Sequence, residues 1–232
     1  MPPRALEPAG VALVDKPAGP SSHAIVAQIR RVTGARTGHA GTLDPFATGL
    51  LLVLSGRTTK LAQCLVGLDK RYRTDIDLTA RTSTGDPEGE VGERLVPPSR
   101  SELDGRLAAL RGEIELPIPA ASAVKIGGER AYRLARRGVE LEMPTRRSTV
   151  YALDVISYTG EAGAIDSVRL DLRVSSGTYV RAIAEALGGH CRTLRRTEIG
   201  PFSVADAVLP EAFEPSRLLP EADVLERVGV SA

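Results

Sequence analysis

The chain has 232 residues, 42% of them hydrophobic and 25% charged, and its formal net charge is +1. This composition is typical of a soluble globular protein, and the length suffices for one buried core or for a large domain with a small appendage. No apolar run approaches the roughly 20 residues of a membrane span, and no signal-peptide pattern begins the chain, so we expect a cytoplasmic protein. The cysteines and histidines have no metal-ligand spacing, which predicts reduced thiols and no metal site.

Charge is distributed unevenly along the sequence. Residues 16–73 contain nine basic and two acidic residues, residues 74–117 contain five basic and ten acidic ones, and residues 118–149 contain seven basic and three acidic ones. Two basic regions on one face would form the surface expected for a nucleic acid. Solvated Arg-rich faces are an equally good explanation, because block charge is a weak signal.

The first third of the chain is predicted to alternate strands and helices. The expected elements are a buried strand at 11–15, a helix from about 22 to 32, a loop at 36–50, an apolar strand at 50–54 and a helix ending near 66. Ser21 or Ser22 would cap the first helix, and Thr58 or Thr59 the second. Cys64 is expected in the core.

The middle of the chain is predicted to begin with a half-buried strand, because apolar and charged residues alternate over 70–80. This alternation favours an antiparallel pairing. The expected elements after it are an exposed loop at 81–98, a helix from 99 to about 111, strands near 112–116 and 120–126, and a basic helix at about 129–137. Ser99 and Glu102 have the spacing of a capping box.

The last part of the chain is predicted to contain a hairpin. The expected elements are strands at 145–158 and 165–175, a helix from 179 to about 187, a strand near 202–208 and a short acidic tail at about 205–232. Helices interspersed with alternating strands predict an α+β or mixed α/β fold, which we expect to form a single domain over residues 1–232.

Several common catalytic motifs are missing from the sequence. The glycines at 34, 38 and 41 are too widely spaced for a dinucleotide-binding motif, and no Gly-Lys-Ser/Thr phosphate loop occurs. No Gly-x-Ser-x-Gly elbow occurs either. Dehydrogenase, NTPase and serine hydrolase activities are therefore excluded as interpretations.

The stretch from Arg36 to Leu50 is the most informative part of the chain. Its glycines permit close approach of another molecule, and Pro45 directs Asp44 away from helical geometry. A lone carboxylate on a rigid loop in a basic region is a candidate for chemistry on a polyanion. An Asp-Pro turn without function is the alternative, and it is common.

Residues 38–49, Gly-His-Ala-Gly-Thr-Leu-Asp-Pro-x-Ala-Thr-Gly, closely resemble the catalytic motif of the bacterial tRNA pseudouridine-55 synthases, the TruB family. Other stretches resemble further family motifs in the right order: Val14-Asp-Lys-Pro-x-Gly-x-Ser-Ser22, Lys70-Arg-Tyr72, Gly128-x-x-Ala-Tyr-x-x-Ala-Arg136-x-Gly138, Gly177-Thr-Tyr-Val-Arg181 and Leu194-Arg-Arg196. The resemblance covers nearly the whole chain.

The resemblance implies a pseudouridine synthase fold, in which helices and loops flank a mixed, mostly antiparallel sheet. It implies isomerisation of a uridine in the T loop of tRNA, where the N1–C1′ bond breaks and C5 joins C1′. No cofactor, metal, membrane, guide RNA or protein partner is implied, and we expect a monomer. Most family members end in an RNA-binding domain of the PUA type, which we expect to be absent here.

The resemblance also assigns roles to particular residues. Asp44 would be the essential acid, acting as a nucleophile or a base at the sugar or the uracil ring. Arg181 would pair with Asp44 and favour its ionised form, since a nearby cation stabilises a carboxylate. Tyr72 would stack on the uracil near C5, and His39 would support the extruded nucleotide.

Further residues of the matching motifs are assigned to substrate binding: Lys16, Gly41, Thr42, Tyr179 and Leu194. Each residue also has a structural interpretation, such as a solvated lysine or a core aromatic. One departure from the family is Ala120-Ala121, where an aromatic residue is usual. A non-catalytic tRNA-folding chaperone and a guide-RNA-dependent synthase are the alternative functions, and the intact acid, tyrosine and arginine argue against the first of them.

Overall fold

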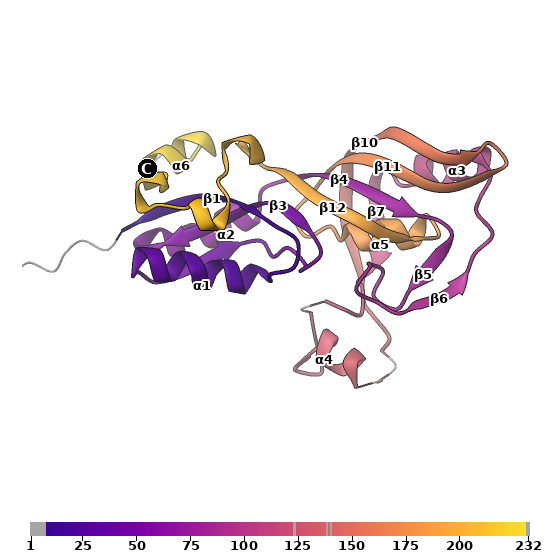
Figure 1. The fold of residues 1–232 in the computed structure, drawn as a ribbon, viewed down its shortest axis with the longest axis horizontal. Coiled ribbons are helices and arrows are strands. Elements are labelled where there is room, and N and C mark those ends of the chain that lie inside the picture. Colours follow the sequence, from indigo (N-terminus) through magenta and orange to yellow (C-terminus); the bar gives the residue numbers. More distant parts are fainter. Residues whose placement is uncertain (1–7, 123, 138, 140, 231–232) are drawn as a thin grey trace, which may run out of the picture. The chain divides into compact units, whose positions relative to one another are not determined.

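A computed structural model describes residues 8–122, 124–137, 139 and 141–230. The chain folds into two compact units, one formed by residues 1–72 and 195–232 and the other by residues 73–194 (Figure 1). The division falls within β4 (Lys70–Asp77) and within β12 (His190–Ile199), so both strands contribute residues to each unit.

The first unit is built around the antiparallel pairing of β1 with β3. Its elements include, in chain order, β1 (Gly10–Lys16), α1 (Ser22–Thr33), β2 (Thr37–Ala40), β3 (Thr48–Ser55), a 3-10 helix (Gly56–Leu61), α2 (Ala62–Val66), β13 (Phe202–Ser203) and α6 (Glu221–Arg227). Strands β1 and β2 pair with β3 in antiparallel fashion, and β12 pairs with β3 in parallel.

Strand β3 is buried on both faces. Leu50, Leu52 and Leu54 pack in a cluster that includes Leu65 of α2, whereas the alternate residues of β3 pack against α1 in a second cluster. A strand covered on both sides is expected to be apolar without interruption, which explains its sequence. The C-terminal segment adds to β1, because the Val11 and Leu219 backbones exchange two hydrogen bonds of 2.9 Å.

The second unit contains a long antiparallel hairpin formed by β10 and β11. The elements of this unit are β5 (Ala80–Thr82), β6 (Val91–Arg94), α3 (Arg100–Ala109), β7 (Gly112–Pro117), β8 (Lys125–Ile126), β9 (Glu129–Arg130), α4 (Ala131–Arg136), β10 (Thr145–Glu161), β11 (Ala164–Val174) and α5 (Val180–Ala186). The strand order is β4-β11-β10-β7. The predicted capping box opens α3, where the Ser99 N–H donates to Glu102 Oε2 at 2.7 Å.

The predicted α+β class and the mixed, mostly antiparallel sheet are confirmed, since β3 and β12 are parallel and the β1–β3 and β10–β11 pairs are antiparallel. Several boundaries were wrong. Strand β12 was not predicted, β2 and the start of β3 lie within the predicted 36–50 loop, and β5 and β6 pair within the predicted 81–98 loop. Cys64 is exposed, because its short helix α2 buries only Leu65.

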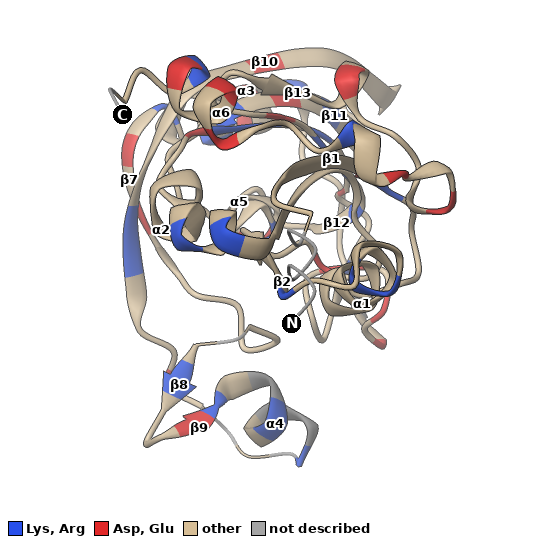
Figure 2. Ribbon diagram, turned by 90° about the vertical axis from the view of Figure 1, so that its left-hand side faces the viewer, with Lys and Arg blue, Asp and Glu red and all other residues tan. Residues whose placement is uncertain are grey.

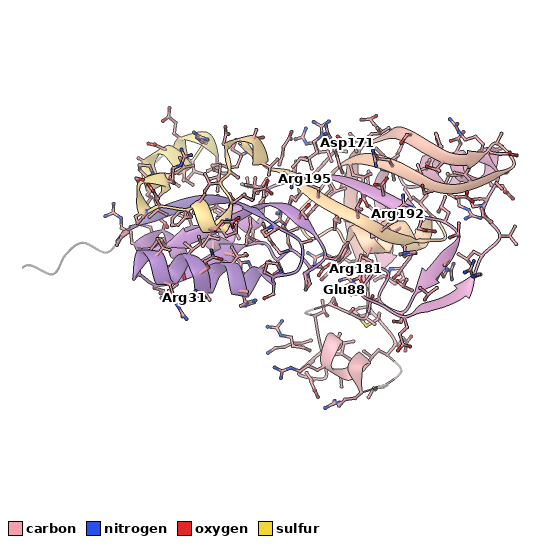
Figure 3. The ribbon with its side chains drawn as sticks, in the orientation of Figure 1. Arg31, Glu88, Asp171, Arg181, Arg192 and Arg195 are labelled. Carbon is pink, nitrogen blue, oxygen red and sulfur yellow. The ribbon has the colours of Figure 1, made fainter. Side chains whose placement is uncertain are left out.

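Basic side chains are exposed in both units. Arg30 and Arg31 lie in the last turn of α1, and Figure 3 shows Arg31 pointing away from the helix. In the second unit, Lys and Arg recur along β8, β9 and α4, where Figure 2 shows them in blue. Within the described part of the chain, no helix is both long and apolar enough to cross a membrane.

Gly49 of β3 should not tolerate a larger side chain. Its φ is 101°, and a Cβ there would lie 2.2 Å from the Arg196 carbonyl oxygen of β12. Gly49→Ala should therefore lower the free energy of unfolding by about 3 kcal/mol or more, through strain and overlap. Denaturant unfolding measures this change.

Gly38→Ala on β2 is the matched control, because no described atom lies within 4 Å of a Cβ built there and its φ is not positive. It should change the free energy of unfolding by about 1 kcal/mol or less. Equal effects of the two substitutions would contradict the close β3–β12 approach.

Candidate active site

Asp44 lies in the connection between β2 and β3, residues 41–47. It is half-buried and lies outside any helix, as the following proline predicts. Gly41 opens the connection with a φ of 91°, and the Ala47 N–H donates to the Asp44 carbonyl at 3.1 Å, which closes a tight turn. The turn therefore presents the Asp44 side chain from a fixed backbone.

Two buried side chains hold the backbone on either side of Asp44. The Ser22 hydroxyl accepts the Leu43 N–H at 2.8 Å and donates to the Leu43 carbonyl at 2.9 Å. The Lys16 ammonium, which is fully buried, donates to the carbonyls of Pro45 at 3.0 Å and Ala47 at 2.6 Å. Lys16 is thus a structural tie of the loop, and the interpretation as a solvated lysine was wrong.

His39 on β2 lies beside His23 of α1, with ring centroids 5.2 Å apart in an edge-to-face arrangement. Burial lowers the pKa of His39, and the positive charges of His23 and Arg196 lower it further. Its Nδ1 is enclosed and has no hydrogen-bond partner among the described residues. The lowered pKa favours the neutral imidazole at pH 7.

Tyr72 lies on the buried side of β4, as the alternation predicts, and is 8% exposed. Lys70 lies on the same side, and its ammonium donates to the carbonyls of Val66 and Leu68, both at 2.5 Å. Burial lowers the pKa of Lys70 to about 8, and the charge of Arg196 adds to this effect. A buried cation thus lies on the same face of β4 as the predicted active-site tyrosine.

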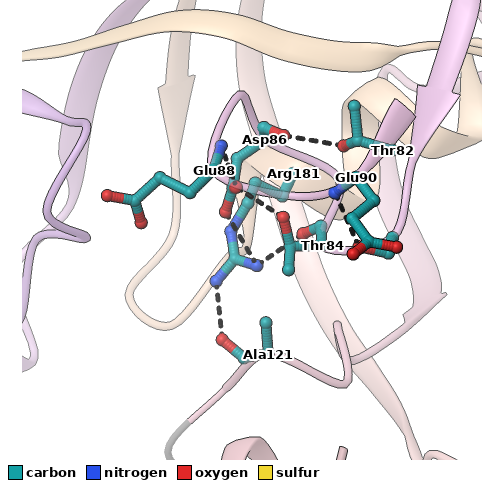
Figure 4. A network of polar contacts seen from close by, with 8 residues as sticks. Thr82, Thr84, Asp86, Glu88, Glu90, Ala121 and Arg181 are labelled. Atoms are coloured by element: carbon teal, nitrogen blue, oxygen red, sulfur yellow. Dashed lines mark hydrogen bonds and ion pairs between the residues drawn. The ribbon is translucent and has the colours of Figure 1, made fainter. Parts of the chain in front are cut away.

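Arg181 lies on α5 in the second unit and is only 3% exposed. Its guanidinium donates to the carbonyls of Thr84 at 2.8 Å and Ala121 at 3.0 Å, and lies 3.4 Å from Asp86 Oδ2 (Figure 4). Asp86 is 4% exposed and also accepts the Glu88 N–H at 3.0 Å. The interpretation of Arg181 as a solvated helix residue was wrong, since the guanidinium is fixed in a buried network.

Tyr179 precedes α5 as its N-cap residue and lines a small pocket with Gly177 and Arg146. The backbone at Gly177 approaches Arg146 closely, because a Cβ there would lie 2.2 Å from its guanidinium. Leu194 lies on β12 and is 8% exposed. The structure therefore places Tyr179 at a surface pocket and Leu194 in packed surroundings.

The nine predicted site residues fall in two groups. The first unit contains Lys16, His39, Gly41, Thr42, Asp44 and Tyr72, and the second contains Tyr179, Arg181 and Leu194. Within the described ranges, no cluster of His, Cys, Asp and Glu has the composition of a metal site.

Sequence reasoning missed the roles of Ser22 and Asp86. Ser22 was considered as a helix cap and as the end of a family motif, whereas Ser21 is the N-cap residue and Ser22 binds the loop. Asp86 was assigned to an exposed loop. One signal could have identified it, because Asp86-Pro87 repeats the Asp-Pro pair of the first unit, in which proline fixes the acid outside a helix.

Comparison with known proteins gives one consistent family. A sequence model of the TruB family pseudouridylate synthase, N-terminal domain, matches residues 29–180. The chain is 44% identical over 224 residues to the tRNA pseudouridine synthase B of Leifsonia xyli subsp. xyli, covering 90% of this chain and 73% of that protein. It is 43% identical over 237 residues to the protein of the same name from Synechococcus sp. (strain WH7803), covering 94% and 78%.

Solved structures share the fold. A chain in the crystal structure of a Cbf5-Nop10-Gar1 complex aligns with a TM-score of 0.68 and 26% identity, over 94% of this chain and 62% of that one. The present chain thus spans about three-fifths of the length of that solved chain. A chain of an H/ACA RNP bound to a substrate RNA containing 2′-deoxyuridine aligns with a TM-score of 0.63 at 23% identity, over 97% of this chain and 57% of that one.

Stability should depend on the protonation of His39. Because burial lowers its pKa, the unfolded chain binds more protons than the folded one below about pH 6.5, so the free energy of unfolding falls as the pH falls. His39→Gln should reduce this loss between pH 7.5 and pH 5.5. Urea unfolding at the two pH values measures it, and a loss of the same size in the variant would contradict the neutral state of His39.

Proposed function

Because the chain belongs to the TruB family of pseudouridylate synthases, we propose that it converts a uridine in the T loop of tRNA to pseudouridine. The reaction breaks the N1–C1′ glycosidic bond and joins C5 of the same uracil to C1′, so it needs an acid or nucleophile at the ring or sugar and a route for the C5 proton. One observation carries the proposal: a single carboxylate, Asp44, stands on a loop whose backbone is held on both sides.

Asp44 is the catalytic acid in this proposal, acting as a nucleophile or a base at the sugar or the uracil ring. A carboxylate on a fixed backbone meets the substrate without a further loss of entropy, and correct placement is a large part of enzymatic rate enhancement. The ties from Ser22 and Lys16 to the neighbouring backbone supply that placement.

Arg181 is proposed to pair with Asp44 and to favour its ionised form. A guanidinium is charged at all physiological pH values, and it needs a fixed orientation to act as a bidentate donor. Asp86 and the carbonyls of Thr84 and Ala121 give Arg181 that orientation within the second unit. Asp86 is therefore a positioning residue in the proposal.

The remaining site residues are proposed to receive the nucleotide. A uridine in a folded loop must leave its stack before reaction, which costs on the order of a few kcal/mol. Tyr72 would stack on the uracil near C5, and the neutral His39 would support the extruded base. Substrate contacts are proposed for Gly41, Thr42, Tyr179 and Leu194. Lys16 is proposed to act on the substrate only indirectly, through its hold on the loop backbone.

The proposed partner is the T arm of tRNA alone. Exposed arginines of α1 and the basic segment of β8, β9 and α4 are suited to contact phosphates. We propose that the protein acts in the cytoplasm as a monomer, without a guide RNA, a protein partner, a metal or a cofactor.

Release of tritium from C5-labelled uridine in T-arm RNA tests this function. The purified protein should release the label without added guide RNA, and Asp44→Asn should lower the rate by on the order of 10³-fold or more while binding persists. Asp69→Asn is the matched control, because Asp69 is the other acid of residues 16–73. It should keep the rate within a few-fold.

Two other outcomes would give different conclusions. Normal turnover by Asp44→Asn would show that Asp44 is not the catalytic acid. Binding and refolding of tRNA without any tritium release by the unaltered protein would instead indicate a chaperone.

A further inference from the structure

Arg196 of β12 is the largest fully buried side chain among the described residues, and it is 1% exposed. Its guanidinium bonds only to backbone carbonyls among the described residues. Nε donates to Leu50 at 2.8 Å, Nη2 to Gly41 at 3.0 Å and Nη1 to Thr42 at 3.4 Å. One side chain thus contacts the Asp44 loop at its first residues, 41 and 42, and β3 just after the loop ends, at residue 50.

Stability alone does not account for a charge in this position. A guanidinium does not lose its proton in proteins, and burying a charge without a counter-ion is unfavourable. No described carboxylate pairs with Arg196, and its charge instead lowers the pKa values of His39 and Lys70. An apolar side chain of similar volume would avoid these costs.

The planar fork of Arg196 suits a different task. Its donors have fixed relative positions, so they hold the carbonyls of residues 41 and 42 at a set distance from that of residue 50. The base of the side chain is fixed as well, because Arg196 pairs with Gly49 of β3. Asp44 follows two residues after Thr42, so the fork sets the direction in which the chain approaches the acid.

The described ties of the loop are divided among three side chains. Ser22 holds residue 43, Lys16 holds residues 45 and 47, and Arg196 holds residues 41 and 42. Lys16 and Ser22 come from the N-terminal part of the chain, whereas Arg196 is more than 140 residues away in sequence. The hydrogen bonds that hold residues 41 and 42 can therefore form only after β12 has paired with β3.

We propose that Arg196 is a positioning residue for Asp44, and that it acts by fixing the carbonyls at the entrance of the loop rather than by touching the RNA. This inference rests on the proposed function, since the effect is read in the isomerisation rate. Loss of the fork displaces Asp44 relative to the substrate, and a misplacement of about 1 Å can lower a rate by about 100-fold.

Two substitutions separate the fork from its charge. Arg196→Met keeps most of the volume and removes the donors, whereas Arg196→Lys keeps the charge but cannot span both ends of the loop. Both should lower the single-turnover rate by on the order of 100-fold, with RNA dissociation constants within about threefold of the unaltered protein. Lysine should restore little of the rate.

Arg195→Met is the matched control on the adjacent residue of β12. Arg195 has a side chain that is 42% exposed, and its guanidinium pairs with Asp15 at 2.8 and 3.0 Å instead of with the loop. This variant should keep the rate within a few-fold.

Amide hydrogen exchange of residues 38–48 provides a readout that needs no activity. Exchange there should accelerate in both Arg196 variants and not in Arg195→Met. If the unaltered protein releases no tritium, the proposed function fails while the exchange result still decides the role of Arg196. Should Arg196→Met not fold, Arg196→Lys supplies both readouts.

Three results would overturn the inference. They are an unaltered rate in a folded Arg196 variant, full recovery of the rate by lysine, and exchange of residues 38–48 that does not respond to either substitution.

Discussion

The placement of Asp44 depends on hydrogen bonds between buried polar side chains and the backbone of residues 41–47. Lys16 contributes a buried ammonium and Ser22 a buried hydroxyl, and both bind main-chain atoms next to the acid. Carbonyl oxygens are the natural partners of these donors, because each has lone pairs that a turn leaves unused.

The apolar core of the first unit packs around β1 and β3, and this packing supports the strands that carry the donors. Strand β3 is covered on both faces, and its residue Gly49 pairs with Lys16 of β1 on one side and with Arg196 of β12 on the other. Gly49 lets the neighbouring backbone approach without a Cβ in the way. The two cations therefore enter the loop from strands on opposite sides of one glycine, and their reach is set by the sheet.

In the second unit, a buried cation is likewise held in a fixed orientation by hydrogen bonds. Arg181 is held by a carboxylate and two carbonyls, so its guanidinium is fixed before any substrate arrives. Asp86 is buried beside Arg181, so the buried guanidinium has a carboxylate partner. Asp44 and Arg181 are thus each oriented within their own unit.

Much of this arrangement could be predicted from the sequence. The Asp44 loop, the strand bearing Tyr72 and the helix of Arg181 followed from motifs and from simple periodicity. Strand β12 was missed because Arg196 is buried, and a charged residue on the inner face breaks the alternation on which strand prediction depends. Asp86 was missed because Gly, Pro and acidic residues around it are typical of exposed loops. In both cases a long-range polar contact outweighed the local pattern.

Amide hydrogen exchange of the free protein tests the central claim most directly, namely that the Asp44 loop is ordered before RNA binds. The Leu43 N–H is bonded to Ser22 and the Ala47 N–H to the Asp44 carbonyl, so both amides should exchange slowly in the free protein and change little when T-arm RNA is added. Rapid exchange of these amides that becomes slow only with RNA would contradict the account, because the loop would then be ordered by its substrate.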